Sequence, residues 1–329
     1  MTSTQNLPSI EHLIAVVTVL HNSAAVVEEC LASIPPTVEV IVVDNRSVDD
    51  SVERASRARA DLTLVRSEFN LGFGAGCNLG WVQTDRPYIA FVNPDAVLER
   101  DTLSRMLQRL IAEPHGIVGP ALLDERGTRR LAHRRPSVMV DFVHLLPGSR
   151  LLTRKSGWDG RLPPDSPIHL AGGPVGYVDG SCFMLRRLDL EAIGGFDNDL
   201  FLYCEEAILT MRLAALGGRA FYEPAALAHH SGAHSTGRTG PTAVSHYFRS
   251  RVVFYRKRDG LTRGGFAAVL LLVGAFIQWL TALTYASLHR RSDNTPETAR
   301  AALRGVADGL TYFVPAHGAR RPHRASGAA

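Results

Sequence analysis

Cysteine is scarce in this sequence of 329 residues, and its four cysteines (Cys30, Cys77, Cys182 and Cys204) lie far apart. They form no CxxC pair and no regular framework, which argues against a disulfide-rich secreted fold and favours small buried thiols in a reducing compartment. Residues 1–12 also lack the basic and apolar regions of a secretory signal. We therefore expect the N-terminal part of the chain to stay in the cytosol.

Two glycine signatures of nucleotide-binding proteins are missing. Neither Gly72 nor Gly74 begins a complete GxGxxG, the first apolar run leads into HNSAAV rather than glycines, and no Walker A motif occurs. The missing dinucleotide fingerprint argues against a nicotinamide dehydrogenase.

Signatures of nucleic-acid binding are missing as well, although the formal net charge is +4. The sequence has no zinc-finger spacing, no RNP-like motif and no basic stripe interleaved with aromatic residues, so we do not expect a nucleic-acid partner. Arginines instead gather in the second half of the chain, which suits phosphate-bearing partners or an anionic membrane surface. They are Arg129, Arg130, Arg134, Arg135, Arg249, Arg251, Arg256 and Arg258.

The first 120 residues alternate between apolar, β-branched runs and helix-like stretches. This alternation predicts an open α/β sheet in which ligands bind beyond the C-terminal ends of the strands. Strands are expected at 13–20, 38–43, 61–66, 87–92 and 116–119, and helices at 24–34, 49–60, 70–84 and 101–112.

The rest of the chain is less regular. Residues 121–170 are rich in Arg, Pro and Gly and predict a variable loop-and-hairpin insertion. A strand at 177–186 and a helix at about 200–216 follow. We thus divide the chain into an extension (1–12), one domain (13–245, with a donor-binding half 13–120, the insertion 121–170 and an acceptor half 171–245), a membrane-associating segment (246–291) and a polar, loose tail (292–329).

Residues 264–288 carry no charge and are long enough to cross a bilayer. Basic residues flank them on both sides, and a single crossing would place the second group outside, against the positive-inside bias. We therefore expect this segment to lie in or re-enter one leaflet at the cytoplasmic face; a buried core helix is the alternative. The flanking residues are Arg256, Lys257, Arg258 and Arg263 before it, and Arg290, Arg291, Arg320, Arg321 and Arg324 after it.

Carboxylates follow two of the predicted strands. Asp44-Asn45 ends the second, where Asp44 could accept hydrogen bonds from a nucleobase or ribose or could cap the next helix. Asn93-Pro94-Asp95 ends another strand, where Asp95 could ligate a divalent cation that bridges two phosphates, or could belong to an ordinary turn.

Three further motifs carry candidate chemistry. The glycine-rich run 70–80 allows backbone amides to approach a phosphate or sugar, or simply packs tightly. Glu205-Glu206 begins an amphipathic helix, where a carboxylate could deprotonate an acceptor hydroxyl or complement the helix dipole. His229 and His230, with His234 nearby, could join Asp95 on a metal or lie in a surface loop; no HExxH spacing supports a zinc hydrolase.

The order and separation of these motifs resemble the inverting family 2 glycosyltransferases of the GT-A fold. They read D-N at 44, N-x-G-x-G-x-G at 70, N-P-D at 93, G-S-C at 180, G-G-F-D at 194, E-E at 205 and H-H-x-x-x-H-S at 229, so the likeness spans about 13–260. Within the family the sequence looks most similar to bacterial rhamnosyltransferases, notably actinobacterial dTDP-rhamnose enzymes acting on polyprenyl-diphosphate-linked N-acetylglucosamine. The resemblance implies one Rossmann-like nucleotide-sugar-binding domain with a mixed central sheet, plus a C-terminal helical membrane-associating segment.

The resemblance also implies a role for each motif. The donor, a nucleoside-diphosphate sugar, would be bound by Thr18, Asn22, Asp44, Asn45, Asn70, Gly72, Gly76, Asn78 and Asn93. Asp95 would carry Mg²⁺ or Mn²⁺, with His229 or His230 near the metal. A lipid-linked or polysaccharide acceptor would lie against Gly180, Ser181, Asp197 and Arg212, with Glu206 as the base and Glu205 beside it.

One motif departs from the family pattern. The usual Y-x-E-D-x-D-L-x-x-R reads here Tyr203-Cys-Glu-Glu206-Ala-Ile208-Leu-Thr-Met-Arg212, so a glutamate stands where the aspartate base belongs and Ile208 replaces a second acid. We expect direct displacement with inversion, with dTDP-L-rhamnose as the favoured donor and another nucleotide sugar as the runner-up. The departure keeps a second hypothesis open, in which the chain is a sugar- or membrane-binding protein that kept the fold and lost its base.

Overall fold

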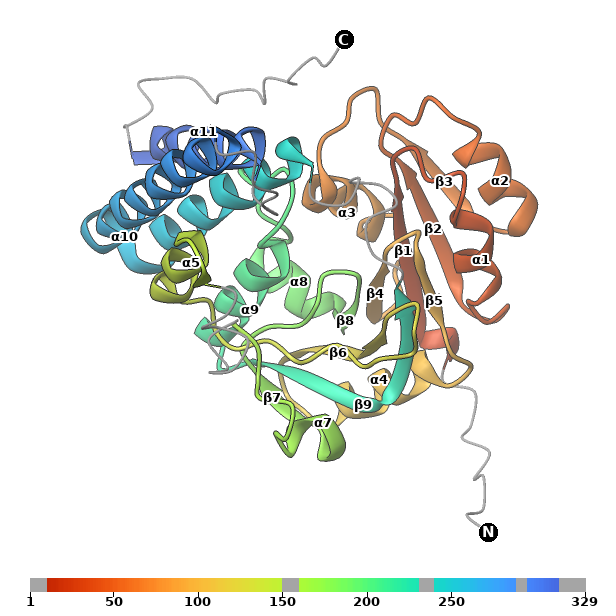
Figure 1. Cartoon of the computed structure of the whole chain (residues 1–329). Helices are drawn as coiled ribbons and strands as arrows, with labels where there is room; N and C mark the ends of the chain where they lie inside the picture. Colours follow the sequence, from red (N-terminus) through yellow and green to blue (C-terminus); the bar gives the residue numbers. More distant parts are fainter. Residues whose placement is uncertain (1–10, 150–159, 231–239, 288–294, 314–329) are drawn as a thin grey trace.

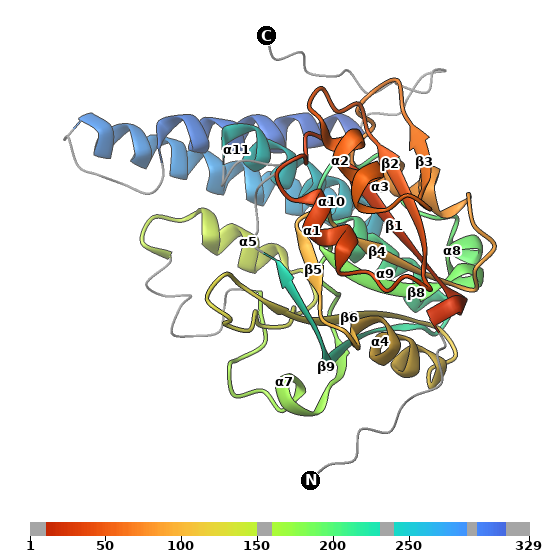
Figure 2. The same ribbon diagram turned by 90° about the vertical axis from the view of Figure 1, so that its right-hand side faces the viewer.

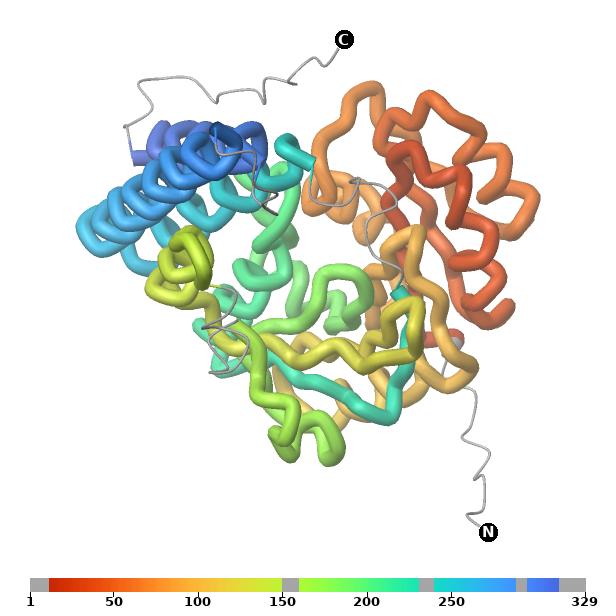
Figure 3. Tube along the Cα trace, in the orientation of Figure 1, coloured from red at the N-terminus to blue at the C-terminus, as the bar shows by residue number. Residues whose placement is uncertain are grey.

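The computed structural model describes residues 11–149, 160–230, 240–287 and 295–313, and it has the α/β fold with a mixed central sheet that the sequence predicts. Helices cover both faces of the sheet, and a further group of helices stands beside it (Figure 1). Followed from red to blue, the chain builds the sheet's first strands at one side and ends in this helical group at the other (Figure 3).

Nine strands form one sheet in the order β3-β2-β1-β4-β8-β6-β9-β5, with β7 also paired to β9. Buried β-branched residues favour strands in its centre: every residue of β1 is buried. The strands are β1 (Ile14–Leu20), β2 (Glu39–Asp44), β3 (Thr63–Arg66), β4 (Tyr88–Val92), β5 (Ala96–Leu98), β6 (Gly116–Leu123), β7 (Gly173–Val175), β8 (Cys182–Arg186) and β9 (Arg219–His230).

Strand direction decides which loops meet. β3, β2, β1 and β4 are parallel, β8 is antiparallel to both β4 and β6, and β6 is parallel to β9. The C-terminal ends of β1, β2, β4 and β9 and the N-terminal end of β8 therefore lie along one edge of the sheet. We call it the ligand edge, because ligands of open α/β sheets bind beyond the C-terminal strand ends.

Two hydrophobic clusters hold the helices on the sheet. On one face, α1 (Val27–Ala32), α2 (Ser51–Ala58) and α4 (Thr102–Ile111) cover side chains such as Val16 and Val40. On the other face, α3 (Phe73–Trp81), α8 (Arg187–Ile193) and α9 (Glu205–Ala215) cover Val17 and Ile41. The alternation of neighbouring β1 residues between the two clusters is the two-residue period of a strand.

Glycines allow α3 to approach β1 closely. A Cβ on Gly76 would lie 2.8 Å from Val19 Cγ1, and a Cβ on Gly80 would overlap Val17 Cγ1 and lie 3.0 Å from Val43 Cγ2. Real side chains do not tolerate such contacts, so these two glycines serve helix packing. The packing alternative for the glycine-rich run therefore holds for its second half.

A third layer consists of α5 (Val138–Leu145), α10 (Pro241–Ser287) and α11 (Pro296–Leu310), which share a cluster with α9. Gly260 breaks the helical path of α10 with φ 79°, and Gly264 then packs against the backbone of Arg256. α10 is thus two helical segments joined at a sharp bend. The end of α10 and the start of α11 extend beyond the rest of the molecule (Figure 2).

The second segment of α10 presents large apolar side chains to solvent at alternating spacings of three and four residues. We call this row the apolar stripe; its most exposed member, Phe266, is 69% exposed. Small residues such as Gly264, Ala267 and Gly274 occupy the opposite, buried face. By length and composition this helix could cross a membrane, and about a third of its most apolar stretch is buried. The stripe comprises Phe266, Val269, Val273, Phe276, Leu280 and Leu283.

Several local expectations were wrong. The insertion 121–170 contains helix α5 and a short helix α7 (Ile168–Ala171) besides its loops, and the tail expected to be loose contains α11 and a 3-10 turn, Thr311–Phe313. The strand expected from 177 begins at Cys182, after a turn. Another 3-10 turn, Glu11–Leu13, precedes β1. Sequence patterns missed α5 and α11 because their stability comes from packing on α10 rather than from propensity alone.

Candidate active site

Asp44 and Asn45 lie at the ligand edge, at the end of β2, and both are buried. Asp44 Oδ1 accepts a hydrogen bond from the backbone N–H of Ser47 at 2.9 Å, while its Oδ2 makes no hydrogen bond to a described residue. Helix α2 begins only at Ser51, so Asp44 does not cap it. The carboxylate therefore presents one oxygen that a ligand could use.

Asn45 organises the start of the glycine-rich run. Its amide nitrogen donates to Asn70 Oδ1 and to the Gly72 carbonyl, both at 3.0 Å, and its Oδ1 accepts from the Leu71 N–H at 2.9 Å. Gly72 has φ 87°, and a Cβ there would overlap the backbone of Phe201. Asn45, Asn70 and Gly72 are thus brought together as predicted, in a network that fixes the loop between β3 and α3.

Three other predicted donor-binding residues differ in their surroundings. Thr18 is fully buried in β1, and its hydroxyl has no hydrogen-bond partner among the described residues. Asn22 is exposed and accepts from the Val48 N–H at 2.9 Å, which joins two loops of the edge. Asn78 bonds to the backbone of Phe196 through both side-chain atoms.

Asp95 is buried next to β5 and faces His230. His230 Nε2 lies 3.2 Å from Asp95 Oδ1, and Arg130 donates to His230 Nδ1 at 3.0 Å. Asp95 and Arg130 thus contact opposite nitrogens of one imidazole ring. The sequence analysis suggested a histidine partner for Asp95, 135 positions later, but not the contact with Arg130.

His229 does not join this group. It precedes His230 on β9, pairs with exposed Glu99 at 3.3 Å and points to the other side of the strand. Both histidines belong to a strand rather than to a loop, and strand alternation separates them. His234 lies outside the described residues.

The donor set around Asp95 suits a hard divalent cation. Asn93 Oδ1 is enclosed without a hydrogen bond among the described residues, two positions before the Asp95 carboxylate. Mg²⁺ and Mn²⁺ take few protein oxygens when phosphates supply the rest. Within the described ranges no group of three or more His, Cys, Asp and Glu side chains could hold a metal ion by itself.

Asp179 is a site residue that the sequence analysis missed. It lies before Gly180-Ser181, accepts from the Ser181 N–H at 3.0 Å, and its Oδ2 lies 3.7 Å from His133 Nε2. Burial alone would raise the pKa of Asp179, but His133, His230 and the Ser181 N–H hold it well below the usual range. The sequence did offer one signal for Asp179: it is a carboxylate three residues before β8, a strand that starts at the ligand edge.

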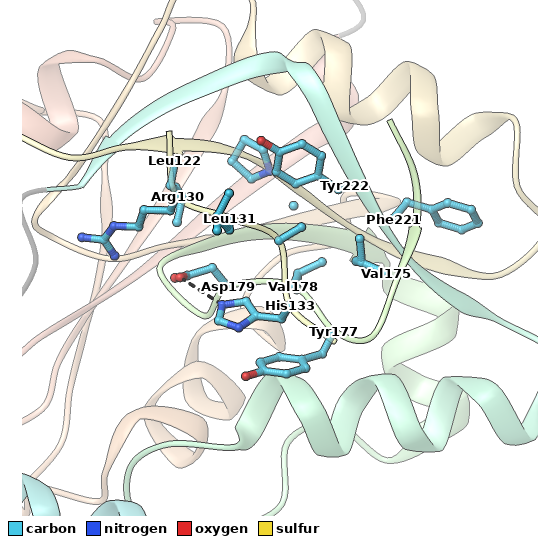
Figure 4. Close-up of a pocket in the computed structure, with 13 residues that line it drawn as sticks. Leu122, Arg130, Leu131, His133, Val175, Tyr177, Val178, Asp179, Phe221 and Tyr222 are labelled. Atoms are coloured by element: carbon cyan, nitrogen blue, oxygen red, sulfur yellow. Dashed lines mark ion pairs between the residues drawn. The ribbon is translucent and has the colours of Figure 1, made fainter. Parts of the chain in front are cut away.

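His133 connects the insertion to this carboxylate. Its ring stacks on Tyr177 at 4.5 Å between centroids, and Figure 4 shows it between the Tyr177 ring and Asp179. A small pocket opens beside it, with Arg130, His133 and Asp179 at one side and Val175 and other apolar residues at the opposite side. The remaining lining residues are Gly119, Pro120, Leu122, Leu131, Ala132, Tyr177, Val178, Phe221 and Tyr222.

The two adjacent glutamates occupy different environments at the start of α9. Glu206 reaches Gly180, whose added Cβ would lie 3.3 Å from Glu206 Oε2. Glu205 is buried beneath α3, near Gly74, and its Oε1 has no partner among the described residues. Burial raises the pKa of both carboxyls; the charge of Glu206 adds to the shift at Glu205, and that of Asp179 adds to the shift at Glu206.

Asp197 and Arg212, both predicted to contact the acceptor, form a structural clamp. Arg212 bonds to Asp197 Oδ2 and donates to the Gly195 carbonyl at 3.0 Å, and Lys257 Nζ lies 2.9 Å from Asp197 Oδ2. The clamp joins α9 and α10 to the turn before residue 200. Gly180 and Ser181, also predicted to contact the acceptor, lie beside Glu206 and Asp179.

The sequence is similar to those of known rhamnosyltransferases. The N-acetylglucosaminyl-diphospho-decaprenol L-rhamnosyltransferase of Mycobacterium tuberculosis is 28% identical over 268 residues, which covers 75% of this chain and 85% of the relative. Rhamnosyltransferase WbbL of Escherichia coli K12 is 26% identical over 172 residues, covering 50% of this chain and 62% of the relative.

Solved structures share the fold. The mannosyltransferase PcManGT from Pyrobaculum calidifontis, in complex with GDP-Man and Mn²⁺, has a TM-score of 0.53 and 19% identity over 91% of this chain and 86% of its own. GalNAc-T7 with UDP, GalNAc and Mn²⁺ also has a TM-score of 0.53, with 14% identity; the match covers 75% of this chain and 48% of that longer one. The family model described as glycosyl transferase family 2 matches residues 15–194, more than half of the chain. This chain therefore belongs to glycosyl transferase family 2, and it has the GT-A fold that its motifs predicted.

Proposed function

We propose that this chain is a metal-dependent, inverting glycosyltransferase that moves a sugar from a nucleoside diphosphate to a lipid-diphosphate-linked acceptor in cell-wall glycan synthesis. The observation that carries this proposal is the position of Glu206, which reaches the Gly180-Ser181 turn beside Asp179. The same turn is bonded to Asn93, because the Asn93 N–H donates to the Ser181 carbonyl at 2.8 Å. A candidate base and a candidate metal ligand therefore flank one turn.

Glu206 would act as the general base. It would take the proton of the acceptor hydroxyl while that oxygen attacks the anomeric carbon, and the bond from that carbon to the diphosphate would break on the opposite side. Inversion follows from this single displacement. The raised pKa of Glu206 favours proton transfer near neutral pH, since a base works best when its pKa lies close to the operating pH.

Asp95 and Asn93 would hold the divalent cation, Mg²⁺ or Mn²⁺, together with the donor diphosphate. When bound, the cation would supply positive charge to the leaving diphosphate. His230, which accepts a hydrogen bond from Arg130, lies 3.2 Å from the Asp95 carboxylate. The Mn²⁺ present in both structural neighbours supports a divalent cation of this kind.

Asp44 would accept hydrogen bonds from the nucleoside through Oδ2, which makes no hydrogen bond to a described residue. The preferred donor is dTDP-L-rhamnose, and the acceptor is a polyprenyl-diphosphate sugar, because the two relatives described above are rhamnosyltransferases and one is named for a diphospho-decaprenol substrate. Another nucleotide sugar bound by the same fold is the alternative.

Ile208, which replaces the family's second acid, occupies a position where burial would favour an apolar side chain. Ile208 is fully buried in the cluster shared by α9, α10 and α11. A carboxylate there would have to leave water without a partner, so an apolar residue fits the third helical layer. This observation favours an active enzyme over a sugar-binding protein that has lost its base.

Transfer can be tested directly. Purified protein with Mn²⁺ is screened against a panel of nucleotide sugars for the one that raises its melting temperature, and that sugar is then offered with a short prenyl-diphospho-N-acetylglucosamine. We expect dTDP-L-rhamnose to bind and a disaccharide-lipid to form with inverted anomeric configuration. A donor that binds without any transfer or hydrolysis would support the non-catalytic alternative instead.

The apolar stripe would hold the enzyme on the membrane, lying in one leaflet with the catalytic domain at the cytoplasmic face. A coiled-coil seam would carry charged residues beside the stripe. The positions that flank it are apolar instead, among them Leu270, Leu272, Ile277 and Trp279, and no charged residue occurs from 264 to 287. This composition favours lipid over a second protein helix.

Vesicle sedimentation tests the membrane proposal. We expect the wild-type protein to pellet with anionic vesicles, and the double variant Phe266→Ser and Phe276→Ser to remain largely in the supernatant. Leu170→Ser on α7 is the matched control, because it removes an apolar side chain that is 87% exposed elsewhere. Equal pelleting of all three proteins would exclude the stripe as the anchor.

A further inference from the structure

A buried arginine on α10 stands beside the candidate base without an ion pair to it. Arg251 is 8% exposed, and its Nε donates to the Tyr247 hydroxyl at 3.0 Å and lies 3.2 Å from Asp141 Oδ2. Its guanidinium also packs over the Tyr247 ring at 5.1 Å. Asp141 belongs to α5, so the insertion holds this side chain in place.

The contacts of Arg251 leave most of its hydrogen-bonding capacity unused. Both terminal amino groups make no hydrogen bond to a described residue, and neither is a fully enclosed atom. A guanidinium carries five N–H donors in a planar fork, of which Nε supplies only one. Four donors of a residue that is more than nine-tenths buried are thus left without a partner among the described residues, on amino groups that keep some contact with solvent.

Glu206 follows Tyr203 by three residues, and the Tyr203 ring packs on the Tyr247 ring of α10 at 5.8 Å between centroids. The charge of Arg251 lowers the pKa of Glu206 against the larger effect of burial, so the two groups lie within electrostatic reach. Arg251 likewise acts on Tyr177, which borders the pocket beside Asp179. Ser250 Oγ donates to the Leu202 carbonyl at 2.7 Å and ties this turn of α10 to the segment that leads into α9.

Asp141 has enough other partners to remain buried when Arg251 binds a ligand. Tyr255 donates to Asp141 Oδ2 at 2.6 Å, and Tyr247 lies 3.5 Å from Oδ1. These hydroxyls stabilise the carboxylate independently of the arginine. The contact between Arg251 and Asp141 is made through Nε. It therefore differs from a bidentate ion pair, in which the guanidinium gives two parallel hydrogen bonds to one carboxylate.

We propose that Arg251 binds the diphosphate of the acceptor, with its two terminal amino groups on phosphate oxygens, and so places the acceptor sugar against Glu206. This inference rests on the proposed function and adds the substrate-binding group that the family motifs do not include. The acceptor consists of sugar, then diphosphate, then lipid, and the chain carries Glu206, Arg251 and the apolar stripe in the same sequence order. One helix, α10, supplies the last two.

Farnesyl diphosphate is a probe that tests the inference without donor, metal or catalysis. In excess EDTA we expect it to raise the melting temperature of the wild-type protein, while farnesol does not. The double variant Asp141→Asn and Arg251→Gln removes both charges of the buried pair together and should lose the response. It avoids the unpaired buried charge that a single Arg251 variant would leave.

The control variant is Arg263→Gln, which removes a positive charge from an exposed position on the same helix and should keep the response to farnesyl diphosphate. The single variant Asp141→Asn keeps the arginine and should keep the response too. A double variant that still responds like the wild type, or a wild type that responds equally to farnesol, would overturn the inference.

Transfer kinetics separate this inference from the proposed function. With prenyl-diphospho-N-acetylglucosamine, the double variant should show a rise in acceptor KM on the order of 10- to 100-fold, the range for hydrogen bonds to charged groups, with donor KM unchanged. With a neutral alkyl N-acetylglucosaminide, its acceptor KM should match the wild type. Equal losses on both acceptors would refute the phosphate contact while leaving transfer intact, whereas a wild type inactive on every acceptor would refute the proposed function.

Discussion

Replacement of Glu206 by glutamine is the sharpest test of the active site. The amide keeps the shape of the side chain that reaches Gly180 and removes its ability to accept a proton. General-base catalysis contributes about 10²- to 10⁴-fold to rate. We therefore expect kcat to fall by that factor, which corresponds to roughly 3–5 kcal/mol of transition-state stabilisation, while donor KM changes little.

Glu205→Gln is the matched control, because it makes the same chemical change one residue away. Glu205 lies beneath α3 with an unpartnered oxygen, away from the Gly180-Ser181 turn. A neutral amide there removes a buried charge, so folding should be unaffected or slightly improved, and kcat should fall far less than in Glu206→Gln.

The pH dependence gives a second readout of the same prediction. A base must be deprotonated to act, so a raised pKa moves the acidic limb of kcat to higher pH. Burial and the charge of Asp179 raise the pKa of Glu206, hence kcat should climb with pH well above the usual range of a glutamate and then level off. The assay is initial-rate transfer over a range of pH, with melting curves to confirm that each variant is folded.

Two results would refute this reasoning. Glu206→Gln with activity within about threefold of wild type, and with the acidic limb unchanged, would mean that another group takes the proton. A larger loss in Glu205→Gln than in Glu206→Gln would move the base one residue earlier and would contradict the orientation of the two side chains described above.

Other predictions concern the metal, packing and the clamp. Asp95→Ala should abolish metal-dependent donor binding measured by calorimetry, and full transfer by this variant in excess EDTA would disprove the metal site. Gly80→Ala should lower the free energy of unfolding by about 1–3 kcal/mol in urea titrations because a Cβ would overlap Val17, whereas Gly265→Ala, in a less crowded helical position, should be neutral or stabilising. Arg212→Lys should lower the melting temperature and leave the acceptor KM nearly unchanged, because the contacts of Arg212 are with Gly195 and Asp197. A rise in acceptor KM without a loss of stability would show that Arg212 contacts the acceptor after all.

Most of the fold could be predicted from local patterns. Short apolar runs rich in β-branched residues predict β1, β2 and β4, because such residues fit a strand that is covered on both faces. β5 and α11 were not predicted because they lack such a local pattern. β5 has only three residues. α11 is stabilised by packing small residues, such as Gly305, against α10.

The sequence by itself determined the family, the sheet and the motifs at its ligand edge, because each of those motifs is a short run whose residues act where a strand or helix ends. Tertiary structure decided which side chains meet. Strand alternation on β9 selected His230 over His229, the first turn of α9 aimed Glu206 and not Glu205 at Gly180, and chain crossings brought His133 to Asp179 and Asp141 to Arg251. Partners more than twenty positions apart leave no periodic signal in one sequence, so only the folded chain could reveal them.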